Sequence, residues 1–296
     1  MRPTNTNDPD KGLAMTPPVA KSIPHYLGIT GVQTALEVRD IVAVAEQLGI
    51  GPTHSHTLML GALVSPATVS NGAPIHTEKP YRHAADREAL REILLAAKEK
   101  NIVGMLHFEL HKKWPGTAGD AASVISLLRF LAASDLHPPV QLNGVVLPEE
   151  VRQIHEQTGV PLVLQLRKEI TQQGTQAVLS YIESVQSAVA KIILDPSAGA
   201  GEAFAVQGAV TLKQEIEDRF PGRFTYVFAG GLGGGQPEDK AWTTSAVKEL
   251  RAQIPSGEFS VDSETKVRRA AHQGVGDVLD IDLCKAYLSA VRSGLV

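Results

Sequence analysis

The sequence predicts a single α/β domain in which eight parallel strands close into a (β/α)8 barrel. Short apolar runs rich in β-branched residues recur along the chain, and each is followed by a stretch with the apolar period of a helix. Strands that alternate with helices pair in parallel and are joined by right-handed crossovers. The length of 296 residues suits one such barrel, which commonly needs ~250 residues.

The first half of the chain contains four strand–helix units. Strands are predicted at 25–30, 57–64, 102–108 and 140–143, and helices end near 46 or span 86–98, 121–133 and the residues after 148. Pro148 and the two glutamates that follow it mark a helix start, because proline and acidic side chains favour the first turn.

The second half adds four more units. Its strands are predicted at 161–166, 191–195, 224–229 and 258–261, with helices at about 172–187 and 280–291. No linker divides the chain, so the barrel is expected to span residues 23–296, preceded by a flexible N-terminal extension at 1–22. An open, doubly wound sheet is the alternative, but such sheets usually have only about five to seven strands.

Composition and charge exclude several classes of protein. Hydrophobic residues make up 43% of the chain and charged residues 20%, as in a globular protein with a sizeable core. The net charge is −4 and no block of like charge occurs, so we expect neither nucleic acid nor a membrane as a partner. The chain has no apolar run long enough to span a bilayer and no recognisable signal peptide, so a cytoplasmic location is expected.

Cysteine and histidine usage gives no sign of a metal site. Cys284 is the single cysteine, which excludes an intrachain disulfide, and its place on a predicted amphipathic helix favours a buried, inert thiol. His54 and His56 have a spacing that would allow metal binding, but they precede the second strand and no third ligand follows at a recognisable distance. We therefore expect no metal and no cofactor.

Glycine-rich or polar turns follow the last three predicted strands, where barrels of this kind often bind phosphate. Glycine lets the backbone approach a ligand closely, and a turn that opens a helix directs several N–H groups at one point. The residues expected to bind phosphate are Gly199, Gly201, Gly230, Gly231 and Ser263. The alternative is that these glycines only form tight turns. A dinucleotide site is disfavoured, because neither glycine turn contains a clean G-x-G-x-x-G.

Five segments along the chain form an ordered series, the last of them before the final helix: Gln141-Leu142-Asn143-Gly144, Ile193-Leu194-Asp195 with Gly199-Ala200-Gly201, Ala229-Gly230-Gly231-Leu232, Asp262-Ser263-Glu264 and Gly274-Val275-Gly276-Asp277. They resemble Q-L-H-G, L-L-D with G-G-T-G, A-G-G-L, D-x-S-S-G-V-E and G-x-K-D of the phosphoribosylanthranilate isomerase family. The resemblance covers about residues 25–296 and is strongest from Gln141 onward. A-G-G-L alone is weak, because other phosphate-binding barrels share it.

The resemblance implies an aldose–ketose isomerase of tryptophan biosynthesis, which performs the Amadori rearrangement of a phosphorylated aminoribose. The family reaction needs an acid that protonates the sugar ring oxygen and a base that removes the C2 proton. Asp195 corresponds to the family's acid. Three positions depart from the family: Leu27 replaces the cysteine that serves as base, Ala67 replaces an active-site arginine, and Asn143 replaces the histidine of Q-L-H-G.

Polar residues at other strand ends are candidates for the missing groups. His107 and Glu109 share one face of the third strand, expected to be the barrel interior, and an imidazole could serve as the base. His107 could instead be a hydrogen-bonded wall residue or a group that orients the substrate. Arg167 could hold a substrate carboxylate or form a salt bridge in its loop. Asp262 could line the pocket or hydrogen-bond the neighbouring loop. The expected substrate-binding residues are Gln141, Asn143, Arg167, Glu109 and Asp262.

The sequence leaves three functions open. The first is phosphoribosylanthranilate isomerase activity with a relocated base. The second is action on another phosphorylated sugar, with Leu27 and Ala67 reshaping the pocket, and the third is binding of a phosphorylated metabolite without turnover. The retained Asp195 and the glycine turns favour an enzyme. The expected ligand is a small phosphorylated sugar, and the protein is expected to be a monomer or a homodimer.

Overall fold

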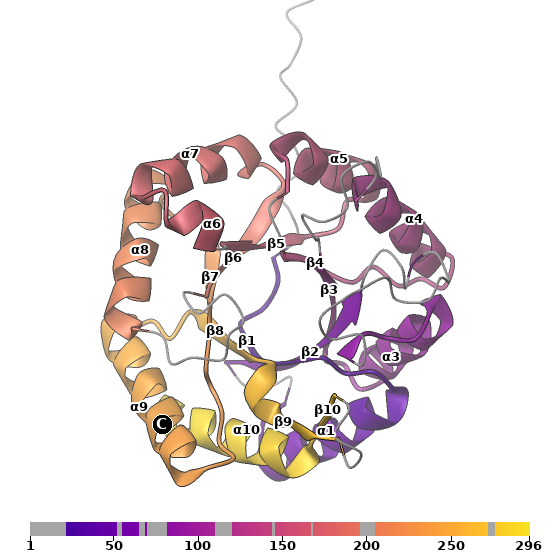
Figure 1. Cartoon of the computed structure of the whole chain (residues 1–296), viewed down its shortest axis with the longest axis vertical. Coiled ribbons are helices and arrows are strands. Elements are labelled where there is room, and N and C mark those ends of the chain that lie inside the picture. The colour runs from indigo at the N-terminus through magenta and orange to yellow at the C-terminus, as the bar shows by residue number, and fades with distance from the viewer. Residues whose placement is uncertain are drawn as a thin grey trace, which may run out of the picture.

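Eight parallel strands close on themselves in the order β1 to β8, with β8 paired to β1 (Figure 1). The computed structural model describes residues 22–51, 55–64, 69, 82–109, 120–143, 146–166, 168–195, 205–271 and 276–296. The strands are β1 (Tyr26–Thr30), β2 (Thr57–Val64), β3 (Val103–Glu109), β4 (Val140–Asn143), β5 (Leu162–Leu166), β6 (Val189–Leu194), β7 (Thr225–Ala229) and β8 (Phe259–Ser263). The predicted single-domain (β/α)8 barrel is confirmed, and the alternative of an open sheet is wrong.

Helices form an outer ring around the barrel (Figure 1). They are α1 (Ala35–Gln47), α3 (Arg87–Glu99), α4 (Asp120–Ala132), α5 (Pro148–Thr158), α6 (Lys168–Thr171), α7 (Thr175–Val185), α8 (Val206–Arg219), α9 (Pro237–Gln253) and α10 (Ile281–Leu295). The helix predicted at 172–187 corresponds to α7, whereas the short α6 ends at Thr171, before the predicted start, and was not predicted. Gly174 separates the two helices with a φ of 92°, a backbone conformation that side chains other than glycine rarely adopt.

Local sequence signals fix where several helices begin. Thr34 and Glu37 form a capping box at α1, in which the Thr34 hydroxyl accepts a hydrogen bond from the Glu37 backbone N–H at 3.2 Å. Asp86 caps α3 in the same way by accepting from the Ala89 N–H at 2.8 Å. Asp280 caps α10 by accepting hydrogen bonds from the Asp282 and Leu283 N–H groups. These side chains satisfy N–H groups that have no partner within the helix, so each helix starts at a defined residue.

The barrel has one packed region outside the sheet and another inside it. Leu27 and Ile29 of β1 belong to the outer region, between the strands and the helices. The inner region fills the middle of the barrel, and its buried members are Ile23, Tyr26, Met59, Met105, Val163, Ile193 and Val227. Because side chains alternate across a strand, residues two positions beyond this inner cluster also face the interior, nearer the carboxyl ends of the strands.

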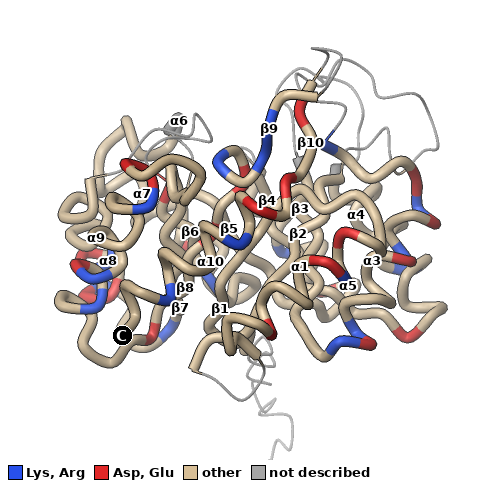
Figure 2. Tube along the Cα trace, turned by 90° about the horizontal axis from the view of Figure 1, so that it is seen from below, with Lys and Arg blue, Asp and Glu red and all other residues tan. Residues whose placement is uncertain are grey.

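A short excursion follows β8 and is absent from the predicted elements. It consists of a 3-10 turn, η2 (Thr265–Val267), and an antiparallel pair of strands, β9 (Arg268–Ala270) and β10 (Asp277–Leu279). Figure 2 shows β9 and β10 standing beyond one end of the barrel. Strands of three residues are too short for a periodic apolar pattern, which explains why the sequence did not predict them.

Three further expectations concern the chain outside the barrel strands. Cys284 is fully buried in α10, as predicted, and burial raises the pKa of its thiol to about 12. No helix in the described ranges has the length and apolar character needed to cross a membrane. The predicted N-terminal extension lies outside the described residues, apart from its last residue.

Lys191 of β6 is an unusual interior residue, because a charged side chain is seldom fully buried. Its Nζ atom lies 3.2 Å from the Ser260 hydroxyl and 5.2 Å from the centre of the Tyr26 ring. Within the described part of the chain no carboxylate pairs with it. Burial lowers the pKa of Lys191 from its ordinary 10.5 to about 7. The ammonium form is therefore costly at neutral pH.

We expect Lys191→Met to stabilise the protein, by roughly 1–4 kcal/mol in urea denaturation near pH 6, because it removes a buried charge but keeps the side-chain volume. Below pH 7 the folded protein carries this charge. Between pH 7 and 10.5 the unfolded chain binds a proton that the folded protein does not, so wild-type stability recovers as pH rises. The stability gained by the substitution should thus shrink toward pH 10. Lys248→Met, on the exposed face of α9, is the control. A gain that does not vary with pH would contradict the interpretation.

Candidate active site

Six inward-facing polar side chains form a ring near the carboxyl ends of the strands, which we call the polar ring. Each is at most 7% exposed, and they come from β1, β3, β4, β5, β8 and the residue directly after β6. The members are Thr30, His107, Gln141, Gln165, Asp195 and Asp262. Buried polar side chains are costly unless they are hydrogen-bonded, so such a ring is a candidate functional site in a barrel of this type.

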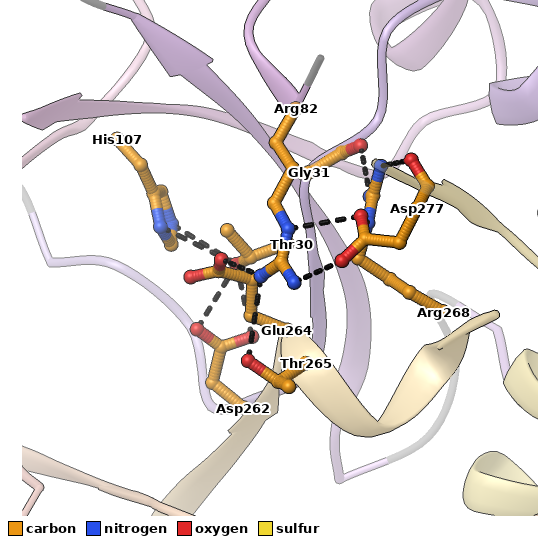
Figure 3. A network of polar contacts seen from close by, with 9 residues as sticks. All are labelled: Thr30, Gly31, Arg82, His107, Asp262, Glu264, Thr265, Arg268 and Asp277. Carbon is orange, nitrogen blue, oxygen red and sulfur yellow. Dashed lines mark hydrogen bonds and ion pairs between the residues drawn. The ribbon is translucent and has the colours of Figure 1, made fainter. Parts of the chain in front are cut away.

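One side of the polar ring is built around the Thr30 hydroxyl. Its Oγ1 atom donates to the Asp262 carboxylate, at 3.0 and 3.1 Å from the two oxygens, and lies 3.3 Å from Nδ1 of His107 (Figure 3). Two glycines make room for these side chains. A Cβ atom at Gly28 would lie 2.5 Å from Oδ1 of Asp262, and one at Gly61 would lie 2.7 Å from Nε2 of His107. The glycines therefore let the carboxylate and the imidazole occupy the barrel interior.

The other side of the polar ring is a directed chain of amides. Nε2 of Gln141 donates to Oε1 of Gln165 at 3.1 Å, and Nε2 of Gln165 donates to Oδ2 of Asp195 at 3.0 Å. The neighbouring strands bring these residues together, since Gln141 is paired with Val163, two residues before Gln165. The chain thus orients the Asp195 carboxyl group toward the interior.

Burial changes the proton affinities of two members of the polar ring. Burial raises the pKa of Asp262 to about 7; the Thr30 hydrogen bond opposes this shift, and the Glu264 and Asp195 carboxylates add to it. Burial lowers the pKa of His107 to about 3. His107 is therefore neutral at physiological pH, whereas Asp262 exchanges its proton near neutrality, as expected of an acid–base group.

A partly buried ion-pair network lies beside the polar ring (Figure 3). Arg82, which is 4% exposed, donates from one guanidinium nitrogen to Glu264 at 2.6 Å and from Nε to Asp277 at 3.0 Å. Arg268 donates to the same Asp277 carboxylate at 2.6 Å and to the carbonyl of Gly31 at 2.9 Å. Burial works against the charge of Asp277, but the two guanidinium groups outweigh it and lower the pKa of this carboxyl group. The network joins the residues before α3, the turn after β1 and the excursion after β8.

The predicted phosphate-binding residues are only partly described. Gly230 and Gly231 follow β7 with φ angles of 113° and 64°, conformations that glycine adopts readily. Ser263 donates its hydroxyl proton to the carbonyl of Leu232 at 2.6 Å. Gly199 and Gly201 lie outside the described residues. After β8 the chain passes through Glu264 into the three-residue η2 turn. Phosphate binding at this end of the barrel remains a prediction.

The structure brings together four of the predicted site residues: Asp195, His107, Gln141 and Asp262. Asn143 and Glu109 are paired in register at the ends of β4 and β3. The Glu109 side chain and all of Arg167 lie outside what the structure describes, as does Ala67.

Leu27 requires a correction, because its side chain packs against the helix layer instead of the interior. The alternation on β1 puts Gly28 and Thr30 inside, so Leu27 cannot reshape the pocket as proposed for a related sugar enzyme. The position of the family's cysteine therefore does not face this site.

Sequence reasoning missed Thr30, Gln165 and Arg82. Gln165 follows the inward Val163 by two residues, and Thr30 follows Gly28 in the same way, so strand alternation could have identified both. Arg82 has no such signal. It comes from the same connection between β2 and α3 as Ala67, and it supplies a guanidinium group near the mouth although the family's arginine is replaced.

The opposite end of the barrel gives no support for a metal site. The Nε2 atom of His56 lies 2.9 Å from the carbonyl oxygen of Phe259, and its Nδ1 atom lies 3.0 Å from the Ser55 hydroxyl. His54 is outside the described residues. Among the residues with described positions, no group of three or more histidine, cysteine or acidic side chains is arranged to hold a metal ion.

No family model and no curated protein sequence matches the chain, but many solved structures share its fold. N-(5'-phosphoribosyl)anthranilate isomerase from Pyrococcus furiosus is 14% identical, over 90% of this chain and 98% of that chain, with a TM-score of 0.51. A truncated 3-deoxy-D-arabino-heptulosonate 7-phosphate synthase from Thermotoga maritima is 11% identical, over 92% and 87%, with a TM-score of 0.51. D-psicose 3-epimerase, solved in the presence of D-fructose, is 12% identical, over 92% and 97%, with a TM-score of 0.50. At these identities the likeness establishes a TIM-barrel fold and nothing finer.

Arg82→Met is expected to lower the free energy of unfolding by about 2–4 kcal/mol, because it removes the cation that Glu264 and Asp277 share and leaves only Arg268 beside Asp277. Thermal or urea denaturation would measure the loss. Arg269→Met is the matched control. Arg269 is 70% exposed and pairs with Asp280 at 3.1 Å, so its loss should cost no more than about 1 kcal/mol. Equal effects of the two substitutions would show that the Arg82 network does not stabilise the fold.

Proposed function

We propose that this chain is an enzyme that isomerises a small sugar-type substrate by proton transfer, with Asp195 and Asp262 as its acid–base pair. One observation carries the proposal. Two buried carboxyl groups, from β6 and β8, face the barrel interior at its carboxyl end, and the pKa of one of them is raised to about 7. The Asp195 charge contributes to that shift, so the two groups are electrostatically coupled. A coupled pair with different environments suits a reaction that needs an acid and a base.

The specific reaction that we propose is the Amadori rearrangement of phosphoribosylanthranilate. Asp195, which matches the family's acid, gives its proton to the ring oxygen as the C1–O bond breaks and an iminium ion forms. Asp262 then takes the C2 proton, and the electrons of that C–H bond form an enamine, which tautomerises to the ketone. A base with a pKa near 7 is well matched to this step at neutral pH.

Asp262 thus takes the role that the family gives to its cysteine. His107 fits that role less well, because a group with a pKa of about 3 is a weak base. In the proposed mechanism His107 instead contacts the Thr30 hydroxyl, which holds the Asp262 carboxylate in place. The turn at Gly230 and Gly231 is proposed to bind the phosphate group.

A related barrel acting on a different sugar is the second candidate. Glu264 follows Ser263 directly, at the turn where the resemblance predicts phosphate binding. A carboxylate at this place opposes a dianion. This carboxylate therefore favours a substrate other than phosphoribosylanthranilate.

We expect the purified protein to convert freshly prepared phosphoribosylanthranilate, followed by the loss of anthranilate fluorescence. Asp262→Asn and Asp195→Asn should each lower kcat by roughly 10²–10⁴-fold, because each removes a proton-transfer group. The control is Asp135→Asn, on an exposed residue that pairs with Lys98 at the surface.

The pH dependence tests the assignment of the base. Because Asp262 must be ionised to accept a proton, kcat/KM of the wild type should rise with pH on the acid side of about 7. Absence of turnover by the wild type would rule out this substrate. Full activity of Asp262→Asn would rule out Asp262 as the base.

A further inference from the structure

While Oδ2 of Asp195 carries no proton, the amide chain of the polar ring has only one consistent direction. The Oδ2 atom of Asp195 accepts a hydrogen bond, so Gln165 must present its NH2 group there and its carbonyl oxygen to Gln141. Gln141 must then use its own NH2 group toward Gln165. Its Oε1 atom is therefore fixed on the other side of the amide, and the side chain cannot turn over without breaking the chain.

The carbonyl oxygen of Gln141 is left without a hydrogen bond. Gln141 is 4% exposed, and its Oε1 atom is buried with no partner among the described residues. A buried acceptor without a partner carries a free-energy cost, because it has lost its hydrogen bonds to water and gained none. Such a cost is uncommon in folded proteins and calls for a functional explanation. Gln141 is paired in register with His107 and lies two residues before the end of β4, so the acceptor belongs to the candidate site.

The acceptor of Gln141 can be satisfied only by a group that brings a donor. The Thr30 hydroxyl does not provide one, because its proton is already donated to Asp262. A ligand that complements this acceptor must therefore bring the donor. An anionic group at this depth would face Asp195 and Asp262, with Glu264 nearby, so the charged part of a ligand must lie farther toward the mouth.

We propose that Oε1 of Gln141 accepts a hydrogen bond from a hydroxyl group of the substrate, which is therefore a polyhydroxylated sugar bound through a neutral, hydroxyl-bearing carbon at the polar ring. This inference rests on the proposed function, because the hydroxyl is assigned to C2, the carbon from which Asp262 removes the proton. Gln141 then determines specificity for that hydroxyl. A site built to bond a hydroxyl rejects an analogue without it, because the acceptor stays unpaired.

Binding measured by calorimetry tests this without turnover, using D-ribose 5-phosphate and 2-deoxy-D-ribose 5-phosphate. Wild-type protein should prefer the first sugar by roughly 10–100-fold. Gln141→Met keeps the side-chain volume but removes the acceptor, so the ratio of the two affinities should fall close to one. The control is Gln157→Met, on the exposed surface of α5, which should keep the wild-type ratio. The comparison forms a double-mutant cycle between a protein group and a ligand group.

Several results would overturn the inference. These are equal binding of the two sugars by the wild type, no binding of either, or an unchanged preference in Gln141→Met. The outcome is separable from that of the isomerase assay. Turnover of phosphoribosylanthranilate without any preference for the 2-hydroxyl would sink the role of Gln141 and leave the acid–base pair standing. The preference without turnover would support the role of Gln141 and rule out phosphoribosylanthranilate as the substrate.

Discussion

The pairing of β1 with β8 is the constraint on which the candidate site depends. It sets Gly28 opposite Asp262, and it lets Thr30 donate to a carboxylate 232 positions away in the sequence. Only a glycine at position 28 leaves room for that carboxylate inside the barrel. If the sheet were open at this seam, Asp262 would lie at a solvated edge, and burial, the main cause of its raised pKa, would disappear.

Lys191 and Asp262 both lie in the barrel interior, where burial disfavours their charged forms, but their surroundings differ. Lys191 has a hydroxyl and an aromatic ring as its neighbours, and the proposed mechanism makes no use of it. Asp262 has Thr30, His107 and Asp195 around it, with Glu264 close by and neutralised in part by Arg82. The cost of burying a charge therefore lowers the stability of the fold at Lys191, whereas at Asp262 it produces a proton-transfer group.

The sequence predicted the parts of this structure that depend on local patterns. The bounds of β2 and β4 match the predicted strands, because each is a continuous apolar or alternating run. Strand alternation also places His107 inside. Arg82 could not be predicted, because its burial depends on Glu264 and Asp277, which are 182 and 195 positions away. The resemblance to the family placed Leu27 in the pocket, but alternation along β1 turns that side chain outward. The placement of these side chains depends on pairing between distant parts of the chain, which no local sequence pattern predicts.

The network around Arg268 joins the beginning of the barrel to its end and therefore affects how the chain folds during synthesis. This side chain holds the carbonyl of Gly31, at the end of the first strand, and the carboxylate of Asp277, near the end of the chain. Contacts between such distant residues carry a large loop-closure cost and form slowly. During synthesis the first strand must therefore wait until nearly the whole polypeptide has left the ribosome before its polar groups find their partners. The barrel can therefore bind a ligand only after the whole chain has been made. In a truncated chain, the side of β1 that pairs with β8 would be an exposed strand edge, which is prone to aggregation.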